Sequence, residues 1–357
     1  MCRRQLAPLI VLAALCVASS AAWAADTLTK KKTGDGEQTR ISGTVESIGS
    51  EEVTIKDGTG KSHTVAVNDI ESLRYEQEPR SMFLARNAAI RGAYEEAIKM
   101  FSEFQEADLT LPEAKVDKDF YLAYCATNLA LTGTGKLEDA EKQLGAFVTA
   151  NPTSYHSLEA SQMWGDVLTL LGNFPGAEKA YDKLIGSRVM GYKMSGSVAK
   201  AYALVKQNKL PEAQKVFESV QSMGSTENPQ DMQQRHAANL GRATCIAKGG
   251  NMPEAIKIIE DVIEKADEDG QLYARAYNTL GSCYLATNNP KEALLAYLRV
   301  DVLYNTVPQE RAEALLQLNK LWTKLDMLPN SQERAKDCVA RLKSLYPTSP
   351  QARSLGG

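Results

Sequence analysis

The sequence predicts a mainly α-helical protein in which a solenoid of helical hairpins follows a small antiparallel β domain. Through most of the chain, apolar and small residues recur at the three-to-four spacing of a helix, and a pattern centred on one alanine returns seven times. Before the first of these segments, apolar and polar residues alternate with the period of two that is typical of strands. These two periodicities divide the chain into a β part and a longer α part.

The stretch from Tyr277 to Val300 shows how one hairpin is built. An Asn-Asn-Pro turn at 288–290 separates two helices, because it stops the first helix and begins the second. The residues that we assign to packing between them are Leu280, Gly281, Tyr284, Ala293 and Tyr297. Since Gly281 and Ala293 carry little or no side chain, the two helix axes can approach to the short end of the usual ~8 to 10 Å.

An alanine equivalent to Ala293 stands in seven segments, which are spaced by 36 to 43 residues. These anchor alanines are Ala97, Ala140, Ala177, Ala213, Ala255, Ala293 and Ala335. The order Leu-Gly-x-x-Tyr, then Ala, then Tyr four residues later resembles the tetratricopeptide repeat, whose standard unit has ~34 residues. The resemblance implies a right-handed α-solenoid of about seven hairpins over residues 77–350, with residues 351–357 as a tail.

Composition and charge are those of an ordinary soluble protein. The 357 residues include 41 Lys and Arg against 44 Asp and Glu. There is no basic excess for a phosphate backbone, so we expect no nucleic-acid partner.

Residues 1–24 have the features of a signal peptide. Two arginines precede an apolar run, and an Ala-Trp-Ala sequence at 22–24 fits a cleavage site, so the mature chain is expected to begin at Ala25. Lipid attachment at Cys16 is an alternative that the preceding leucine disfavours, and a twin-arginine signal matches only in part. No later stretch approaches the ~18 consecutive apolar residues of a membrane span. We therefore expect a soluble protein that is exported to the bacterial periplasm or the medium.

Residues 25–37 are polar and rich in Lys, Thr and Gly, which predicts a disordered spacer. The alternation over residues 38–76 then predicts three or four short strands, with a hairpin turn at the Asp-Gly-Thr-Gly sequence of 57–60. Their order resembles small SH3-like or Sm-like barrels and is about a strand short of closure, so an exposed sheet edge is expected. Acidic residues balance the basic ones in this segment and no aromatic residue precedes Tyr75, which argues against the nucleic-acid binding of some such barrels.

The cysteines after the signal segment are Cys125, Cys245, Cys283 and Cys338, an even number that would suit a disulfide set. Cys245 and Cys283 lie at equivalent positions of neighbouring hairpins, whose helices stack ~9–10 Å apart. Because a disulfide needs Cα atoms within ~7 Å, we expect buried free thiols. If a bridge forms, Cys245 with Cys283 is the first pair to test.

The sequence shows no pattern for catalysis, a metal or a cofactor. The three histidines, His63, His156 and His236, have no further ligand at metal-binding spacing. The Gly-Thr-Gly-Lys sequence at 133–136 lacks the upstream glycine and the following hydroxyl residue of a phosphate-binding loop. No Gly-x-Ser-x-Gly nucleophile elbow occurs either. We therefore predict a protein that is not an enzyme.

Two functions of different kinds remain. In the first, the protein is an exported scaffold of the cell envelope whose superhelix binds an unidentified protein or peptide, as the family resemblance implies. In the second, it is a structural oligomeriser in which the β segment pairs with its own copies and the helices act as spacers.

The resemblance also implies a binding face. In this family the concave surface is formed by the first helix of each hairpin, at positions set relative to the Gly281-type residue. Carried onto this chain, these positions select Arg86, Gln162, Asp166, Tyr202, Val205, Arg275, Asn278, Ser282 and Leu285. We expect Tyr202 and Arg275 to be the anchors, because Tyr and Arg dominate the binding energy of buried patches. The set lacks the lysine and asparagine cluster by which chaperone-binding relatives hold a carboxylate, so such a clamp is not expected.

Overall fold

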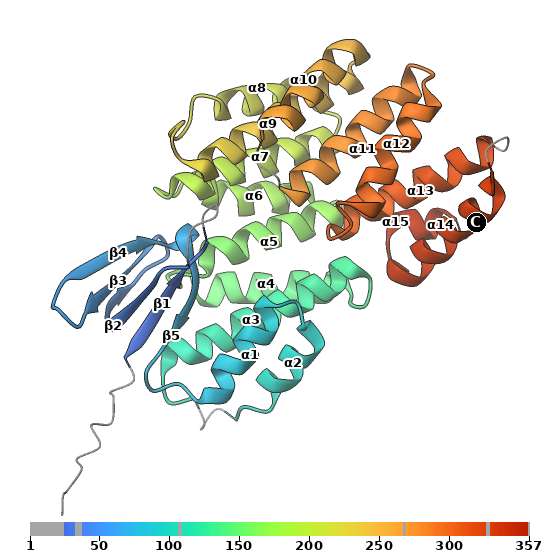
Figure 1. Ribbon diagram of the computed structural model, residues 1–357. Helices are drawn as coiled ribbons and strands as arrows, with labels where there is room; N and C mark the ends of the chain where they lie inside the picture. Colours follow the sequence, from blue (N-terminus) through green and yellow to red (C-terminus); the bar gives the residue numbers. More distant parts are fainter. Residues whose placement is uncertain (1–24, 33–37, 106–108, 267–268, 326–328, 356–357) are drawn as a thin grey trace, which may run out of the picture.

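A five-stranded sheet lies beside a curved array of helices in the computed structural model (Figure 1). The structure describes residues 25–32, 38–105, 109–266, 269–325 and 329–355. The predicted signal peptide at 1–24 and the second part of the predicted spacer, residues 33–37, lie outside the described residues.

Fifteen α-helices are found in the described residues, and the first fourteen form seven consecutive hairpins. Their bounds are α1 (Arg80–Ile90), α2 (Tyr94–Ser102), α3 (Pro112–Thr132), α4 (Leu137–Ala150), α5 (Ser157–Leu170), α6 (Phe174–Ile185), α7 (Met190–Lys206), α8 (Leu210–Val220), α9 (Pro229–Lys248), α10 (Met252–Lys265), α11 (Gly270–Ala286), α12 (Pro290–Val302), α13 (Pro308–Lys324), α14 (Ser331–Leu345) and α15 (Pro350–Ser354). The mainly helical, repetitive architecture predicted from the periodicity is confirmed.

Each hairpin turns at a residue with positive φ. These residues are Gly92, Gly133, Gly172, Asn208, Gly250, Asn288 and Asn330. In every hairpin except the second, the turn residue stands five positions before the anchor alanine. Only glycine adopts this left-handed conformation freely, and asparagine tolerates it better than other residues. The turn chemistry therefore repeats with the helices.

Small residues stand where the two helices of a hairpin pack together. All seven anchor alanines are buried, and Leu280 is buried with them, while Tyr284 is half-buried against the same core. A Cβ added at Gly281 would lie 2.7 Å from the ring of Tyr297, and one added at Gly165 would lie 2.4 Å from the ring of Tyr181. The tyrosine rings thus rest on glycine backbone, and a side chain there would force the helices apart.

The sheet contains one more strand than the sequence pattern predicted. Its strands are β1 (Asp26–Lys30), β2 (Arg40–Ile48), β3 (Glu52–Asp57), β4 (Ser62–Ala66) and β5 (Ile70–Arg74), in the antiparallel order β4-β3-β2-β1-β5. The spacer prediction is wrong for β1, which lies between β2 and β5. This short strand has one strongly apolar side chain, Leu28, which is fully buried. The Asp26 carboxylate accepts hydrogen bonds from the backbone N–H groups of Val45 (2.8 Å) and Glu76 (2.9 Å).

The predicted likeness to a small barrel is not confirmed. Strands β4 and β5 are the two ends of the sheet order, so the described strands form an open sheet. One face is apolar, because Val53, Ile55 and Val65 alternate with exposed or half-buried polar residues.

The apolar face of the sheet packs against the middle of the helical array. Leu28 and Leu73 of the sheet share a buried cluster with Tyr155, Leu184 and Tyr192. Polar contacts reinforce this junction, since Arg188 pairs with Glu51 and the Asn68 amide donates to Gln230. The β part and the α part therefore share one core.

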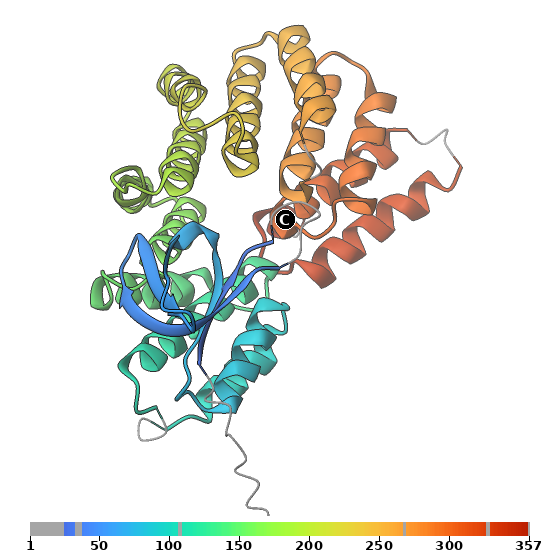
Figure 2. The same cartoon turned by 60° about the vertical axis from the view of Figure 1, so that its left-hand side comes forward.

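The array curves until its last hairpin returns to the second one (Figures 1 and 2). Helix α13 contacts α3, and a Cβ added at Gly133 would lie 3.0 Å from Pro347. The short helix α15 packs against α13 and α14 with Ala352 buried. The prediction of a tail at 351–357 is therefore wrong for the residues of α15.

Candidate binding surface inside the array

Two groups of side chains occupy the surface formed by the first helices of the hairpins. The first group surrounds a cavity between α3, α5 and α7, and the second joins α7 to α11 and α13. Both groups contain residues that the repeat positions selected.

The first group lines a cavity of about 340 Å³. Helix α3 supplies Tyr124 and Leu131, and α5 supplies Gln162, Met163 and Asp166. Lys31, which follows β1, contributes to the same cavity, so the sheet takes part in it. Apolar walls with a few polar groups are typical of sites that bind a ligand.

Asp166 is the charged group of this cavity whose environment is most unusual. The Tyr181 hydroxyl donates a 2.7 Å hydrogen bond to its carboxylate. The surrounding protein desolvates the carboxylate and raises its pKa to about 6, although the Tyr181 hydrogen bond and the cations Arg275 and Lys206 act in the opposite direction. Asp166 is nevertheless exposed to water, so it lies in a concave part of the surface rather than in the core.

The same position carries a neutral group in the sixth hairpin. Ser282 follows Gly281 as Asp166 follows Gly165, and Ser282 shares a 3.1 Å hydrogen bond with the Tyr297 hydroxyl. Ser282 and Asn278 line a separate cavity of about 290 Å³ between α9, α11 and α13. The array thus repeats a tyrosine-to-polar contact and changes its charge from one hairpin to another.

The second group is centred on Arg275. Its guanidinium lies 4.4 Å from the centre of the Tyr202 ring, and its Nε donates to Glu310 at 3.2 Å. The Asn278 amide donates to the backbone oxygen and the carboxylate of Glu310, and Tyr202 donates to the backbone oxygen of Ala237. Since α7 and α11 belong to hairpins separated by a whole unit, this contact reflects the tight curvature of the array.

Three of the nine predicted face residues are buried, and this corrects the sequence-based set. Arg86 is enclosed by other charged groups, Val205 packs in the core of the fourth and fifth hairpins, and Asn278 is held by Glu310. Leu285 is partly buried against the core. Gln162, Asp166, Tyr202, Arg275 and Ser282 remain accessible to different degrees.

The environment of Arg86 could not be predicted from the repeat. Its guanidinium makes two hydrogen bonds to Glu78, of 3.0 and 2.8 Å, and one of 2.9 Å to Asp117. His156 lies 3.3 Å from the same Asp117 carboxylate and stacks on Phe120. Glu78 lies in the connection from the sheet to α1, so this ionic cluster ties the two parts of the molecule together.

The described cysteines are buried free thiols, as predicted. Burial raises the pKa of Cys125 to about 12 and that of Cys245 to about 11. Because the thiolate is the reactive form, these side chains behave as small apolar groups.

Within the described ranges, no cluster of three or more His, Cys, Asp or Glu side chains could hold a metal ion. In that same part of the chain, no helix combines the length and apolar character that a membrane span requires.

The architecture defines an α-solenoid of helical hairpins with a β sheet packed on one side. The model of the tetratricopeptide repeat family matches residues 234–300, which include most of the fifth and sixth hairpins. Residues 234–300 therefore match the tetratricopeptide repeat, as the resemblance of these hairpins implied, and the rest of the array shares its helical-hairpin fold.

Similar solved structures have low sequence identity to this chain. A tetratricopeptide repeat protein from Parabacteroides merdae is 14% identical, with a TM-score of 0.52, and the match covers 77% of this chain and 96% of that one. The type IV pilus biogenesis factor PilW is 13% identical with a TM-score of 0.41, covering 68% and 99%. The C-terminal part of a repeat protein from Cytophaga hutchinsonii is 15% identical with a TM-score of 0.40, covering 76% and 98%. No curated protein matches the sequence.

Proposed function

We propose that the protein is an exported, non-enzymatic scaffold of the cell envelope that binds an extended segment of a partner protein along the inner surface of its array. The cavity containing Gln162 and Asp166 carries this proposal. It combines apolar walls with two acidic groups, Glu159 and Asp166, and a lysine, and it opens on the surface that the first helices form.

The arrangement of cavities favours an extended chain over a small molecule. The cavities at Asp166 and at Ser282 hold about 340 and 290 Å³ and lie on the two sides of the Tyr202–Arg275 contact. Separate pockets of this size suit successive side chains of one peptide. The contact between α13 and α3 narrows access to the inner surface, which favours an unfolded segment over a folded domain.

Export is supported by the sequence alone. The apolar run and the Ala-Trp-Ala sequence within residues 1–24 have the pattern of a cleaved signal peptide. We expect N-terminal sequencing of the protein from a periplasmic fraction to begin at Ala25, and an acylated Cys16 would contradict this.

The binding proposal is tested with a variant of the cavity that preserves the fold. Gln162→Ala combined with Asp166→Asn removes one amide and one charge from partly accessible positions. The chain from Ala25 is used to capture partners from an envelope extract, and captured proteins are compared by quantitative mass spectrometry. A partner of the inner surface should be depleted at least tenfold by the double variant and retained by the control Glu95→Gln with Glu96→Gln, which changes exposed residues of α2. Equal capture by all three proteins would place binding elsewhere.

The oligomeriser is the second candidate, and the open edge of β4 favours it, because β4 pairs only with β3 among the described strands. Deleting the β part would not test this function cleanly, since the shared core would be opened. Sedimentation of the intact chain from Ala25 over a hundredfold concentration range measures the oligomeric state instead. A single monomeric species throughout would exclude assembly through the sheet edge at these concentrations.

A further inference from the structure

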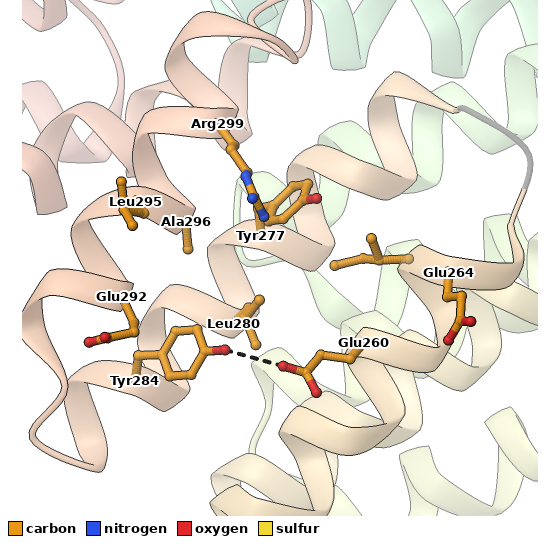
Figure 3. Close-up of a pocket in the computed structure, with 10 residues that line it drawn as sticks. Glu260, Glu264, Tyr277, Leu280, Tyr284, Glu292, Leu295, Ala296 and Arg299 are labelled. Carbon is orange, nitrogen blue, oxygen red and sulfur yellow. Dashed lines mark hydrogen bonds between the residues drawn. The ribbon is translucent and has the colours of Figure 1, made fainter.

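A groove on the outer surface of the array combines an apolar lining with acidic side chains at its border. It lies between α10 and α12, has α11 as its floor and encloses about 350 Å³ (Figure 3). Tyr277 and Leu280 form the floor, and Leu295 and Ala296 form the wall on α12.

The exposed leucine of this wall departs from the pattern of the chain's own repeat. Two positions after the anchor alanine, the first five hairpins carry lysine: Lys99, Lys142, Lys179, Lys215 and Lys257. The sixth hairpin carries Leu295 at this position, and Leu295 is 61% exposed. A single exposed leucine needs no explanation, but Leu295 is contiguous with the apolar lining of the groove, and an apolar patch with a polar rim marks an interaction site.

The apolar surface continues along the same helix beyond the groove. Val302 is 63% and Leu303 is 64% exposed, and Val302 lies seven residues after Leu295 on the same side of α12. From Glu292 to Val302, where α12 ends, the helix extends ~15 Å, at ~1.5 Å per residue. A partner helix of about three turns matches this length.

Acidic side chains border the groove. Glu260 and Glu264 stand on α10 and Glu292 on α12, and all three are exposed. The Tyr284 hydroxyl donates to Glu260 at 3.2 Å and fixes one of these carboxylates at the rim. Arg299, the one basic residue of the lining, lies 5.0 Å from the centre of the Tyr277 ring. The lining therefore has two more negative than positive side chains.

We propose that this groove docks a basic amphipathic helix of a partner protein, with the apolar face of that helix on Leu295 and its lysines or arginines beside the three glutamates. The binding mode is that of a helix in an apolar groove with complementary charges. It does not depend on occupation of the inner surface, so the protein can hold two segments at once. An anionic membrane surface would be repelled by the same glutamates.

The test uses a defined probe, a fluorescein-labelled twelve-residue peptide of leucine and lysine. Its leucines recur at the three-to-four spacing of a helix, so they form one apolar face, and lysines occupy the other positions. Fluorescence anisotropy with the chain from Ala25 should show binding of this peptide and none of the matched leucine and glutamate peptide. Leu295→Lys, which introduces the residue of the first five hairpins, should weaken binding at least tenfold. Glu260→Gln with Glu264→Gln and Glu292→Gln should weaken it about tenfold at low salt and less at high salt.

A matched control separates the groove from general attraction to an acidic protein. Glu95→Gln with Glu96→Gln and Glu103→Gln removes the same charge from exposed positions in α2 and directly after it, and should leave binding unchanged. The proposal is overturned if Leu295→Lys binds the peptide like the natural chain, or if the control triple variant weakens binding as much as the groove variant. It is also overturned if sedimentation shows a dimer that Leu295→Lys dissociates, because the occupant is then a second copy of the chain.

Discussion

Arg86 and Arg275 both stand on first helices of hairpins, and their surroundings differ sharply. Arg86 is 1% exposed and binds two carboxylates, one from the connection to the sheet and one from α3. Arg275 is 32% exposed, pairs with Glu310 and stacks on the Tyr202 ring. The first arginine joins two parts of the fold, and the second leaves part of its guanidinium accessible on the inner surface.

The difference shows that a repeat position does not fix the role of a side chain. Burial disfavours the charged guanidinium of Arg86, but Asp117 and the Glu78 hydrogen bonds outweigh this effect and raise its pKa well above its ordinary value. The dependence is mutual, because removing either the guanidinium or the carboxylates would leave the remaining charge buried without a partner. Arg275 and Glu310 are partly solvated by water, so the attraction between them is weaker than that between Arg86 and its carboxylates.

The largest effect is expected from Arg86→Met. This change leaves Glu78 and Asp117 buried without their cation, and breaking a buried ion pair on one side costs ~3–5 kcal/mol. Arg275→Met removes a half-exposed pair and should cost below ~1 kcal/mol. Urea unfolding of both variants, followed by circular dichroism, measures the two losses of free energy of unfolding. Equal losses would show that the two arginines do not differ in role.

How much of the fold and of the candidate binding surface could be predicted from the sequence depends on which contacts are local. Turn residues, anchor alanines and glycines repeat within one hairpin, so the sequence alone assigns Gly281 and Tyr297 to the packing between its two helices. That the Tyr297 ring lies directly on Gly281 is seen only in the structure. Arg86 is covered by Glu78 and Asp117, and no spacing in the repeat encodes that contact. The contact of Tyr202 with Arg275 depends on the curvature of the whole array, which accumulates over several hairpins.

Strand β1 illustrates the same limit in the sheet. Its five residues, DTLTK, contain one leucine and resemble a polar linker in isolation. The strand is stable because β2 and β5 supply hydrogen bonds on both sides and the helices cover Leu28. A central strand can therefore have a weak apolar pattern when its neighbours supply most of its contacts.

A smaller effect is expected for the coupling between Arg275 and Glu310. A double-mutant cycle with Arg275→Met and Glu310→Gln should give ~0.5–1 kcal/mol, the upper part of the range for accessible pairs. Glu310 is 18% exposed and also accepts from Asn278, which limits its movement. The same cycle for Arg86 and Asp117 should give a severalfold larger value. A coupling at Arg275 equal to that at Arg86 would contradict the assignment of the inner arginine to an accessible surface.

The smallest expected effect concerns Asp166, whose pKa of about 6 is raised chiefly by desolvation. The folded protein keeps this proton to higher pH than the unfolded chain, whose carboxyl has the ordinary value of 3.8. Ionisation of Asp166 therefore lowers the free energy of unfolding as pH rises from about 4 to 6, and its contribution is constant above that window.

Tyr181→Phe removes the hydrogen bond that favours the carboxylate, so the pKa of Asp166 should rise further. Tyr297→Phe is the matched control, because Tyr297 has the equivalent position in the sixth hairpin and contacts Ser282 instead. Carboxyl carbon NMR of the Asp166 side chain measures these values, and a pKa that falls in Tyr181→Phe, or moves equally in Tyr297→Phe, would contradict the role given to the Tyr181 hydroxyl.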